Sequence, residues 1–341
     1  MIEEYILDKI DTKVYLSESF DPGINLSFEE YLMSVCDENS VIMYLWQNKK
    51  TVVIGRNQNP MQECQISNLL KDGVRLVRRL SGGGAVYHDI GNLNFTFIAH
   101  VKRYDVQKQL HVILGAIAAF DIKGEFTGRN DLTINGKKFS GNAFMNEDDI
   151  YCHHGTIMVD VELEKLVRYL TPTKVKITSK GIDSVKGRVV NLKECNNSLT
   201  IESLKKQLML TFEKNYQSKS RVTLLTPQDY HLIGIYKDKY DSNEWNINES
   251  PKCDISHERK FSWGLIEISM SIKNGIIVNC AINTDSIIVD NFQHLQTHLM
   301  GSKLVDLQLN SIIDKVIKNK TIRNDLKLLV KDFNLSNTDT E

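Results

Sequence analysis

The 341-residue chain lacks the features that would place it in a membrane, outside the cell or on nucleic acid. No apolar run approaches the roughly 20 residues that a membrane-spanning helix needs, and residues 1–11 include acidic side chains but no apolar signal-peptide core. The six cysteines contain no CxxC pair, which disfavours a zinc site or a disulfide framework. A net charge of −1 argues against a strongly basic nucleic-acid binder. We therefore expect a cytoplasmic protein with no membrane and no nucleic-acid partner.

The remaining composition is that of an ordinary globular protein, with 41% hydrophobic and 25% charged residues. The length favours two domains, and we find no internal repeat or low-complexity segment. A polar stretch that contains Pro251 is the best candidate for a linker. We expect a large domain over residues 1–245, a linker over 246–257 and a small domain over 258–341.

Hydrophobic periodicity predicts the elements of both domains. Helices are expected over residues 25–37, 66–71, 107–120, 162–170, 200–215, 292–299, 305–317 and 322–332. Strands are expected over residues 41–46, 51–54, 94–99 and 156–161, and a hairpin over 261–272 and 276–282.

Three consecutive glycines, Gly82 to Gly84, separate two β-prone runs. Glycine permits positive φ and a close approach of a ligand, and successive exposed backbone N–H groups bind anions. Arg78 and Arg79 precede the glycines, and a guanidinium matches carboxylate or phosphate oxygens. The stretch is neither a P-loop nor a dinucleotide fingerprint. It indicates an anion-binding turn or, alternatively, a flexible hairpin loop with exposed arginines.

A second informative cluster surrounds Asn135-Gly136, which predicts a two-residue hairpin. Lys138 and Ser140 would then share one face of the returning strand. Asn130 and Asp131 lie across the hairpin and offer oxygens to a magnesium ion, although such residues are also common in turns with no further role.

Three further features carry possible chemistry. His153 and His154 are adjacent on an expected strand, so they point to opposite faces and are poor joint metal ligands. Cys152 beside them is a candidate nucleophile, although a lone thiol is more often inert packing. Residues 174–193 contain six basic side chains and one acidic one, a pattern that is usually a solvated face, but their two glycines also predict a flexible lid over a polyanion.

Together these clusters resemble the lipoate–protein ligase A family of the biotin/lipoate ligase superfamily. Residues 78–88 resemble its glycine-rich signature, and residues 128–131, 136–142 and 153–155 resemble its later blocks in the same order. The resemblance covers nearly the whole chain. It implies an α/β fold of α+β type: a large biotin-ligase-like catalytic domain with mixed sheets, and a small α+β C-terminal accessory domain.

The resemblance also implies a function. Members of the family use ATP and magnesium to convert lipoate to lipoyl-AMP, then pass the lipoyl group to a lysine of an acceptor protein. The acceptors implied are E2 subunits of 2-oxo acid dehydrogenases and the glycine-cleavage H protein. The chemistry suits a fixed ammonium, because a carboxylate attacking a phosphate brings two anions together.

Residue roles follow from the match to the family motifs. Lys138 corresponds to the central catalytic lysine, and Asp131 is the candidate magnesium ligand. The residues implied to bind ATP or the adenylate are Arg79, Ser81, Gly82, Gly83, Gly84, Ala85, Val86, Tyr87, Asn130, Asp131, Lys138 and Lys180. Those implied to bind lipoate are Leu26, Phe28, Glu30, Trp46, Arg79, His88, Lys138, Ser140 and His154.

The chain departs from common family residues at Met145, Lys186 and Val190. Two alternatives therefore stay open: a cysteine-dependent octanoyl or lipoyl acyltransferase that uses Cys152, and a non-catalytic lipoate-binding protein. A biotin ligase is less favoured because its arginine-bearing glycine turn differs. The sequence does not decide which acceptor is preferred, whether lipoate or octanoate is the preferred acid, or what the oligomeric state is.

Overall fold

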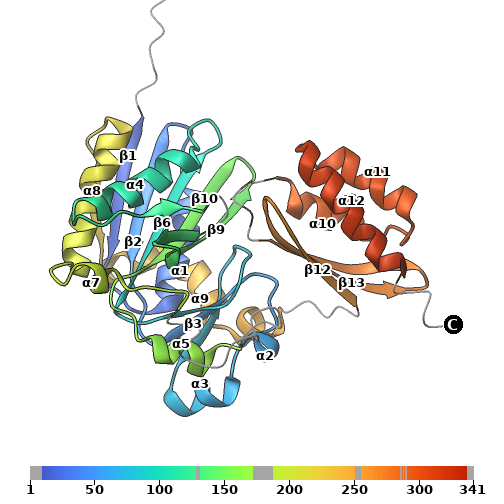
Figure 1. Cartoon of the computed structure of the whole chain (residues 1–341), viewed down its shortest axis with the longest axis horizontal. Coiled ribbons are helices and arrows are strands. Elements are labelled where there is room, and N and C mark those ends of the chain that lie inside the picture. The colour runs from blue at the N-terminus through green and yellow to red at the C-terminus, as the bar shows by residue number, and fades with distance from the viewer. Residues whose placement is uncertain are drawn as a thin grey trace, which may run out of the picture.

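The computed structural model describes residues 10–127, 131–171, 187–249, 255–284, 286, 288 and 290–335. A mixed eight-stranded sheet forms the centre of the large domain (Figure 1), in the order β11-β1-β2-β6-β10-β9-β8-β7. Its strands are β1 (Asp11–Ser17), β2 (Ser40–Trp46), β6 (Asn92–His100), β7 (Glu125–Phe126), β8 (Asp131–Ile134), β9 (Lys137–Glu147), β10 (Ile150–Met158) and β11 (Arg221–Leu225).

The pairing of strands changes once across this sheet, from parallel to antiparallel. β1 runs parallel to both β2 and β11, whereas the pairs from β2 through β6, β10, β9 and β8 to β7 are antiparallel. Every residue of β2 is buried, because the sheet is covered on both faces. Its side chains alternate between the two cores: Met43 packs on one side and Tyr44 on the other.

Helices form these two cores. On one face α4 (Val106–Ala118) packs against α8 (Ile201–Tyr216). On the other face α1 (Pro22–Ser34) packs against α9 (Gly234–Asp241) and the 3-10 helix η2 (Pro227–Ile233). We call these the α4 face and the α1 face of the sheet.

Local sequence signals fix where several helices begin and end. Asp21 caps α1, with Pro22 following at the first helical position. Thr200 caps α8 through the backbone N–H of Ser203. Gly73 ends α3 (Ile66–Asp72) with a left-handed φ of 63°, which glycine adopts without a Cβ penalty.

A second, three-stranded sheet has the order β4-β3-β5. β3 (Thr51–Ile54) lies in the middle, parallel to β4 (Arg75–Arg78) and antiparallel to β5 (Val86–His88). The glycine turn therefore joins two strands that flank β3 and do not pair with each other, so it is not a hairpin. The expected strands at 41–46 and 51–54 are confirmed, but they belong to different sheets. Short helices lie nearby: α2 (Pro60–Glu63), α3, α5 (Leu163–Tyr169) and α7 (Leu192–Cys195).

The C-terminal unit has a hydrophobic core of its own, drawn from residues 263–333. In this unit three helices pack against a sheet of three antiparallel strands, shown in orange and red in Figure 1. The sequence missed the first strand, because its alternation is interrupted by charged residues. The elements are β12 (Ile255–Phe261), β13 (Gly264–Lys273), β14 (Ile276–Thr284), α10 (Phe292–Leu299), α11 (Asp306–Val316) and α12 (Lys320–Leu335).

The two units touch near the glycine turn. The side-chain amide of Asn57 donates to the carbonyl oxygen of Ile282 at 3.0 Å. A Cβ added to Gly82 would lie 3.2 Å from the carbonyl oxygen of Thr284. The end of β14 therefore lies against the turn, where a larger residue than glycine would crowd it.

The expected combination of a large mixed α/β domain and a small α+β unit is confirmed. The domain boundaries stay a prediction. The first residues of the expected linker, 246–248, belong to the π-helix η3 (Glu244–Asn248), which packs against β4. Residues 250–254 lie outside the described part of the chain. Within that described part, no helix has the length and apolar character needed to cross a membrane.

Candidate active site

Arg78 is a structural residue. Its side chain is fully buried, and its guanidinium donates to the carbonyl oxygens of Gln58 at 2.7 Å, Arg56 at 2.9 Å and Trp245 at 2.9 Å. It thereby ties η3 to the loop after β3. Burial lowers the pKa of Arg78 to about 10, which still leaves it protonated at neutral pH. The interpretation of the stretch as a loop with exposed arginines is wrong.

Arg79 is hydrogen-bonded to the glycine turn. It is 6% exposed, and its Nη2 donates to the carbonyl oxygens of Gly82 at 2.6 Å and Gly84 at 2.8 Å. Burial lowers the pKa of Arg79 to about 10, and the charge of Glu29 acts in the opposite direction. Among the described residues no carboxylate pairs with this guanidinium, so the turn keeps a positive charge that suits an anionic ligand.

The backbone of the turn adds donors to this charge. Within the described ranges, the N–H groups of Gly82, Gly83 and Gly84 donate no hydrogen bond. Gly83 has a φ of 86°, a conformation that favours glycine. Successive unpaired N–H groups beside a buried cation form an anion-binding nest. A Cβ added to Gly83 would lie 4.0 Å from that of Ala143, so the nest lies against β9.

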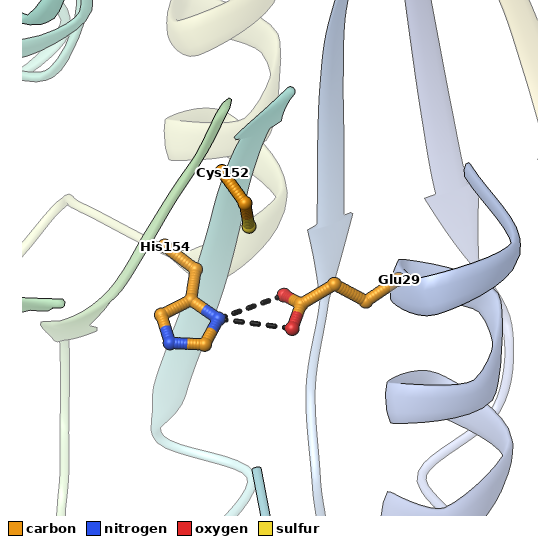
Figure 2. A group of neighbouring side chains, drawn as sticks. All are labelled: Glu29, Cys152 and His154. Atoms are coloured by element: carbon orange, nitrogen blue, oxygen red, sulfur yellow. Dashed lines mark hydrogen bonds and ion pairs between the residues drawn. The ribbon is translucent and has the colours of Figure 1, made fainter. Parts of the chain in front are cut away.

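A chain of hydrogen bonds leads from the α1 face of the sheet to the turn. The indole of Trp46 donates to Thr96 Oγ1 at 3.0 Å, and that hydroxyl donates to Glu29 Oε2 at 2.6 Å. Both oxygens of Glu29 lie about 3 Å from Nδ1 of His154, as Figure 2 shows. Glu29 comes from α1 and His154 from β10, so the contact joins the helix to the sheet.

His154 connects Glu29 to the glycine turn by hydrogen bonds. Its Nε2 lies 2.6 Å from Ser81 Oγ, and Arg79 Nε donates to the same hydroxyl at 3.0 Å. Arginine has no acceptor, and the carbonyl oxygen of Gly82 lies farther from the hydroxyl, at 3.4 Å, so the Ser81 proton points to the nearer acceptor, His154. The imidazole then carries its own proton on Nδ1 and donates it to Glu29. Every group in this chain is buried and satisfied, a condition under which a polar network fixes one geometry.

Lys138 lies on β9 just after the Asn135-Gly136 hairpin. Both turn residues have positive φ, 50° and 76°, which confirms the hairpin. The Lys138 ammonium pairs with the Asp131 carboxylate at 2.6 Å. A Cβ on Gly141 would lie 2.8 Å from Nζ of Lys138, so glycine at 141 makes room for the lysine side chain.

A β-bulge changes which face the residues after Lys138 occupy. Lys138 pairs with Thr133, but the next paired residue is Ser140, opposite Leu132. Phe139 is the extra residue of the bulge, so Lys138 and Ser140 point to opposite faces. The prediction that the two share a face is wrong. Ser140 is on the α4 face with Leu132, and its buried hydroxyl makes no hydrogen bond to the described residues.

The structure thus brings Lys138 and the glycine turn to one face of β9. The Lys138 side chain lies over Gly141, and two residues further along Ala143 lies against Gly83. The backbone of Lys138 also pairs with the described end of the expected lid, through Arg188 O at 2.8 Å and Val190 N at 3.0 Å. Residues 172–186, with Lys180 and Lys186, lie outside the described residues, as does Asn130.

Comparison with known proteins identifies the family of this chain. Residues 21–213 match the family described as the lipoyl protein ligase A/B catalytic domain, and residues 250–331 match the bacterial lipoate protein ligase C-terminus. The chain therefore belongs to the lipoate-protein ligase A family. Its predicted activity class, ligation of lipoate to protein, is confirmed by that membership and by the relatives below.

Lipoate-protein ligase A of Blochmanniella floridana is 35% identical over 299 residues, 86% of this chain and 89% of the relative. The enzyme of the same name from Bdellovibrio bacteriovorus is 35% identical over 296 residues, 85% of this chain and 87% of the relative. Among solved structures, P. falciparum LipL1 in complex with lipoate has a TM-score of 0.78 at 29% identity, and the match covers 93% of this chain and 98% of that chain. A lipoate-protein ligase A bound with ATP has a TM-score of 0.61 at 21% identity, with 70% and 98% covered, and shows a shared fold.

The residues that the ligase family implies for lipoate lie mostly in one core. Leu26, Phe28 and Trp46 are buried between α1 and the sheet, on the same side as His154. Glu30 has another partner: its carboxylate bonds the ammonium of Lys239 on α9 at 2.6 Å. The acidic residue of α1 that reaches His154 is Glu29. The role of Glu30 in binding lipoate stays a prediction.

Residues 85–87, which the family match assigns to the adenylate, alternate between two sides of β5. Val86 packs with the core of the α1 face, whereas Ala85 and Tyr87 pack on the far side with Tyr169. Only backbone atoms of Ala85 and Tyr87 are therefore available towards the turn.

Two residues at which the chain departs from the family, Met145 and Val190, are both buried.

His88 presents an unused donor in this core. Its Nδ1 lies 3.3 Å from the amide nitrogen of Asn48, whose proton it accepts, so the proton of the ring is on Nε2. That Nε2 is buried and makes no hydrogen bond to the described residues. A buried donor without a partner suits a polar ligand atom. Burial, with Arg79 and His154 nearby, lowers the pKa of His88 to about 3.

This depressed pKa predicts a loss of stability in mild acid. The unfolded chain protonates His88 below about pH 6.5, while the folded protein keeps it neutral down to about pH 3. His88 therefore has almost no effect on the free energy of unfolding at pH 7, and it lowers this free energy as the pH falls below about 6.5. At pH 5 the expected loss is about 2 kcal/mol, from about 1.4 kcal/mol per pH unit. Urea unfolding of wild type and His88→Gln at pH 7 and pH 5 tests this: the variant should lose about 2 kcal/mol less, and equal losses would contradict it.

Cys152 shares this neighbourhood (Figure 2). Its Sγ, a Glu29 oxygen and a His154 nitrogen lie within 4.8 Å of one another, a set that could hold a metal ion. Both imidazole nitrogens are already bonded, however, to Glu29 and to Ser81. Burial and the charge of Glu29 raise the pKa of the Cys152 thiol well above its usual value, which opposes a thiolate nucleophile.

The two histidines point to opposite faces, as predicted. His153 bonds Gln109 of α4 and Asn142, whereas His154 bonds Glu29 on the α1 face. Sequence reasoning missed Glu29 and Thr96 as site residues. A signal for Glu29 was present: it lies three residues after Leu26 and three before Leu32, which places it on the buried stripe of α1.

Proposed function

We propose that Lys138 and the glycine turn together bind one lipoyl-adenylate, and that the protein forms it from lipoate and ATP before passing the lipoyl group to a lysine of an acceptor. The proposal rests chiefly on one observation: an ammonium and a nest of N–H groups that have no partner among the described residues lie along the same face of β9. Attack of a carboxylate on the α-phosphate concentrates negative charge. Fixed positive charge and aligned donors stabilise that charge as it develops.

The acyl chain has an apolar path on the α1 face. Phe28 and Trp46 are buried there beside His154, and an apolar wall suits the hydrocarbon chain and dithiolane of lipoate. The unused Nε2 proton of His88 lies in the same core and is available to a ligand.

Asp131 is a suitable magnesium ligand. Its carboxylate is about one-third exposed and already lies beside the ammonium of Lys138, where phosphates would bind. Protein-bound magnesium usually takes one or two carboxylates together with substrate phosphates. When bound, the ion would neutralise phosphate charge. Lys138 itself would orient the α-phosphate and the incoming carboxylate.

Acceptor proteins with a lipoyl domain are the proposed partners. The fold is shared with a structure from the structural analysis of an archaeal lipoylation system, a bipartite lipoate protein ligase and its E2 lipoyl domain from Thermoplasma acidophilum, at a TM-score of 0.64 and 23% identity, with 72% of this chain and 100% of that chain covered. We propose E2 lipoyl domains and the glycine-cleavage H protein as acceptors. The free thiols of Cys36, Cys64, Cys152, Cys195 and Cys280 support a cytoplasmic setting.

Adenylate formation tests the proposal. The protein is incubated with ATP, magnesium and lipoate, octanoate or biotin, and pyrophosphate release and the acyl-AMP mass are recorded. Purified H protein or an E2 lipoyl domain is then added. We expect lipoyl-AMP and a modified acceptor lysine, and no product with biotin. Binding of lipoate without pyrophosphate release would instead indicate a non-catalytic binding protein.

Replacement of Cys152 separates the ligase from a cysteine-dependent acyltransferase. We expect Cys152→Ser to keep lipoyl transfer within about twofold of wild type, because the buried thiol is held protonated and both ring nitrogens of the neighbouring His154 already have partners. The measurement is the rate of acceptor lipoylation with lipoate and ATP. Loss of transfer with the adenylate still formed would favour the cysteine route.

A further inference from the structure

Ser81, His154 and Glu29 stand in the order of a nucleophile, a base and a residue that orients the base. Ser81 Oγ lies 2.6 Å from Nε2 of His154, and Nδ1 on the far side of the ring lies 2.9 Å from Glu29 Oε2. These are the contacts by which a serine hydroxyl is activated in unrelated hydrolases, where geometry and not sequence position defines the arrangement. The adenylate site alone does not require this arrangement, because formation of the adenylate needs no enzyme nucleophile.

The hydrogen-bond directions are those that activation requires. Arg79 Nε can only donate to Ser81, and the other acceptor near the hydroxyl, the carbonyl oxygen of Gly82, lies 3.4 Å away, so the Ser81 proton points to His154 Nε2 at 2.6 Å. Arg79 leaves one lone pair of Oγ free and places a positive charge 3.0 Å from it. His154 can accept the hydroxyl proton while Glu29 stabilises the imidazolium that forms.

Donors for a developing oxyanion lie next to the same hydroxyl. The N–H groups of Gly82, Gly83 and Gly84 follow Ser81 directly and have no partner within the described residues. Ser81 itself is 1% exposed, while Gly82 and Gly83 are half-buried and Gly84 is exposed. An acyl carbonyl would therefore reach Oγ from the side of the turn.

We propose that Ser81 is a nucleophile that takes an activated medium-chain acyl group and releases it to water without ATP. Oγ attacks the carbonyl carbon of an acyl ester or thioester, and its proton moves to His154 Nε2. The carbon–oxygen bond to Ser81 forms as the bond to the alcohol or thiol breaks, and the leaving group takes the proton. Water then attacks the acyl-serine, His154 again accepts the proton, and the free acid and Ser81 hydroxyl are restored. The preference for a lipoyl-like chain rests on the proposed function; the serine chemistry does not.

An ester that needs no ATP tests this directly. The full-length protein is mixed with p-nitrophenyl octanoate, and nitrophenol release is followed together with the mass of the peptide that contains Ser81. We expect release with an initial burst and an octanoyl group on Ser81. Ser81→Ala should slow release at least about 10²-fold, the usual contribution of a serine nucleophile being larger still. Ser81→Cys should form a thioester that neutral hydroxylamine removes, and it keeps the test open if Ser81→Ala fails to fold.

Two kinds of control assign the roles. Glu29→Gln keeps a hydrogen-bonding group beside His154 but removes the charge, so the pH profile of nitrophenol release should shift, an effect that a merely structural role would not produce. Ser34→Ala, at an exposed serine at the end of α1, and Cys152→Ala should both leave release unchanged. Equal release by wild type and a folded Ser81→Ala protein would overturn the proposal, as would no release by a wild type that forms lipoyl-AMP. Release with no lipoyl-AMP formation would support the serine chemistry and count against the ligase.

Discussion

Lys138→Ala should lower pyrophosphate release with lipoate and ATP by at least about 10²-fold while the protein stays folded, because one fixed charge opposite a developing oxyanion is worth about 3–4 kcal/mol. The lysine is more than one-third exposed and lies over Gly141 rather than in the core. Its loss should therefore leave the thermal unfolding midpoint close to that of wild type. Both quantities are measured on the same preparation.

Lys137 provides the matched control. It is the neighbouring lysine of the same hairpin, and it is exposed. We expect Lys137→Ala to keep pyrophosphate release within about twofold of wild type, since a solvated charge on the other side of the strand contributes little. Equal rates for the two variants would remove Lys138 from the mechanism.

Arg78→Lys should lower the free energy of unfolding by about 3 kcal/mol or more. The guanidinium supplies hydrogen bonds to the carbonyl oxygens of Gly55, Arg56, Gln58, Trp245 and Asn246. An ammonium has three donors, so at least two buried carbonyls lose their partner at about 1–3 kcal/mol each. Urea denaturation monitored by tryptophan fluorescence measures the change, since Trp245 packs at this site.

Arg75→Lys is the control on the same strand. Arg75 is 41% exposed and pairs with Asp21 and Asp241 at the surface. Exposed ion pairs contribute about 0–1 kcal/mol, so this variant should stay within about 1 kcal/mol of wild type. A small loss for Arg78→Lys, similar to that for Arg75→Lys, would show that the buried carbonyls find other donors and that Arg78 is not the residue that joins η3 to the loop after β3.

Local signals predicted much of the fold because they act within a few residues. The Asn135-Gly136 pair requires two positive φ angles, and Gly73 ends α3 in a left-handed conformation, so both were visible in the sequence. The glycine turn was recognisable for the same reason. Its place in the fold was not, because β4 and β5 both pair with β3, and that pairing depends on contacts distant in sequence.

The errors at the site have the same origin. A period-two pattern places Lys138 and Ser140 together, but one extra residue at the bulge turns Ser140 to the α4 face. Glu29 and Glu30 are adjacent, and only the packing of α1 against β10 decides that Glu29 meets His154 while Glu30 meets Lys239. The adjacent arginines likewise have different roles: Arg78 bonds η3, whereas Arg79 bonds the glycine turn. Their sequence neighbourhood is the same, so it could not predict this difference.

The central claim is that one acyl–nucleotide anhydride lies between Lys138 and the glycine turn. A crystal structure of the protein with bound lipoyl-AMP tests it most directly. We predict the anhydride within hydrogen-bonding distance of both Lys138 Nζ and the N–H groups of Gly82 to Gly84, with the acyl chain beside Trp46. A ligand found elsewhere, for example in the roughly 600 Å³ cavity lined by Lys49, Lys165 and Arg168, would contradict the account.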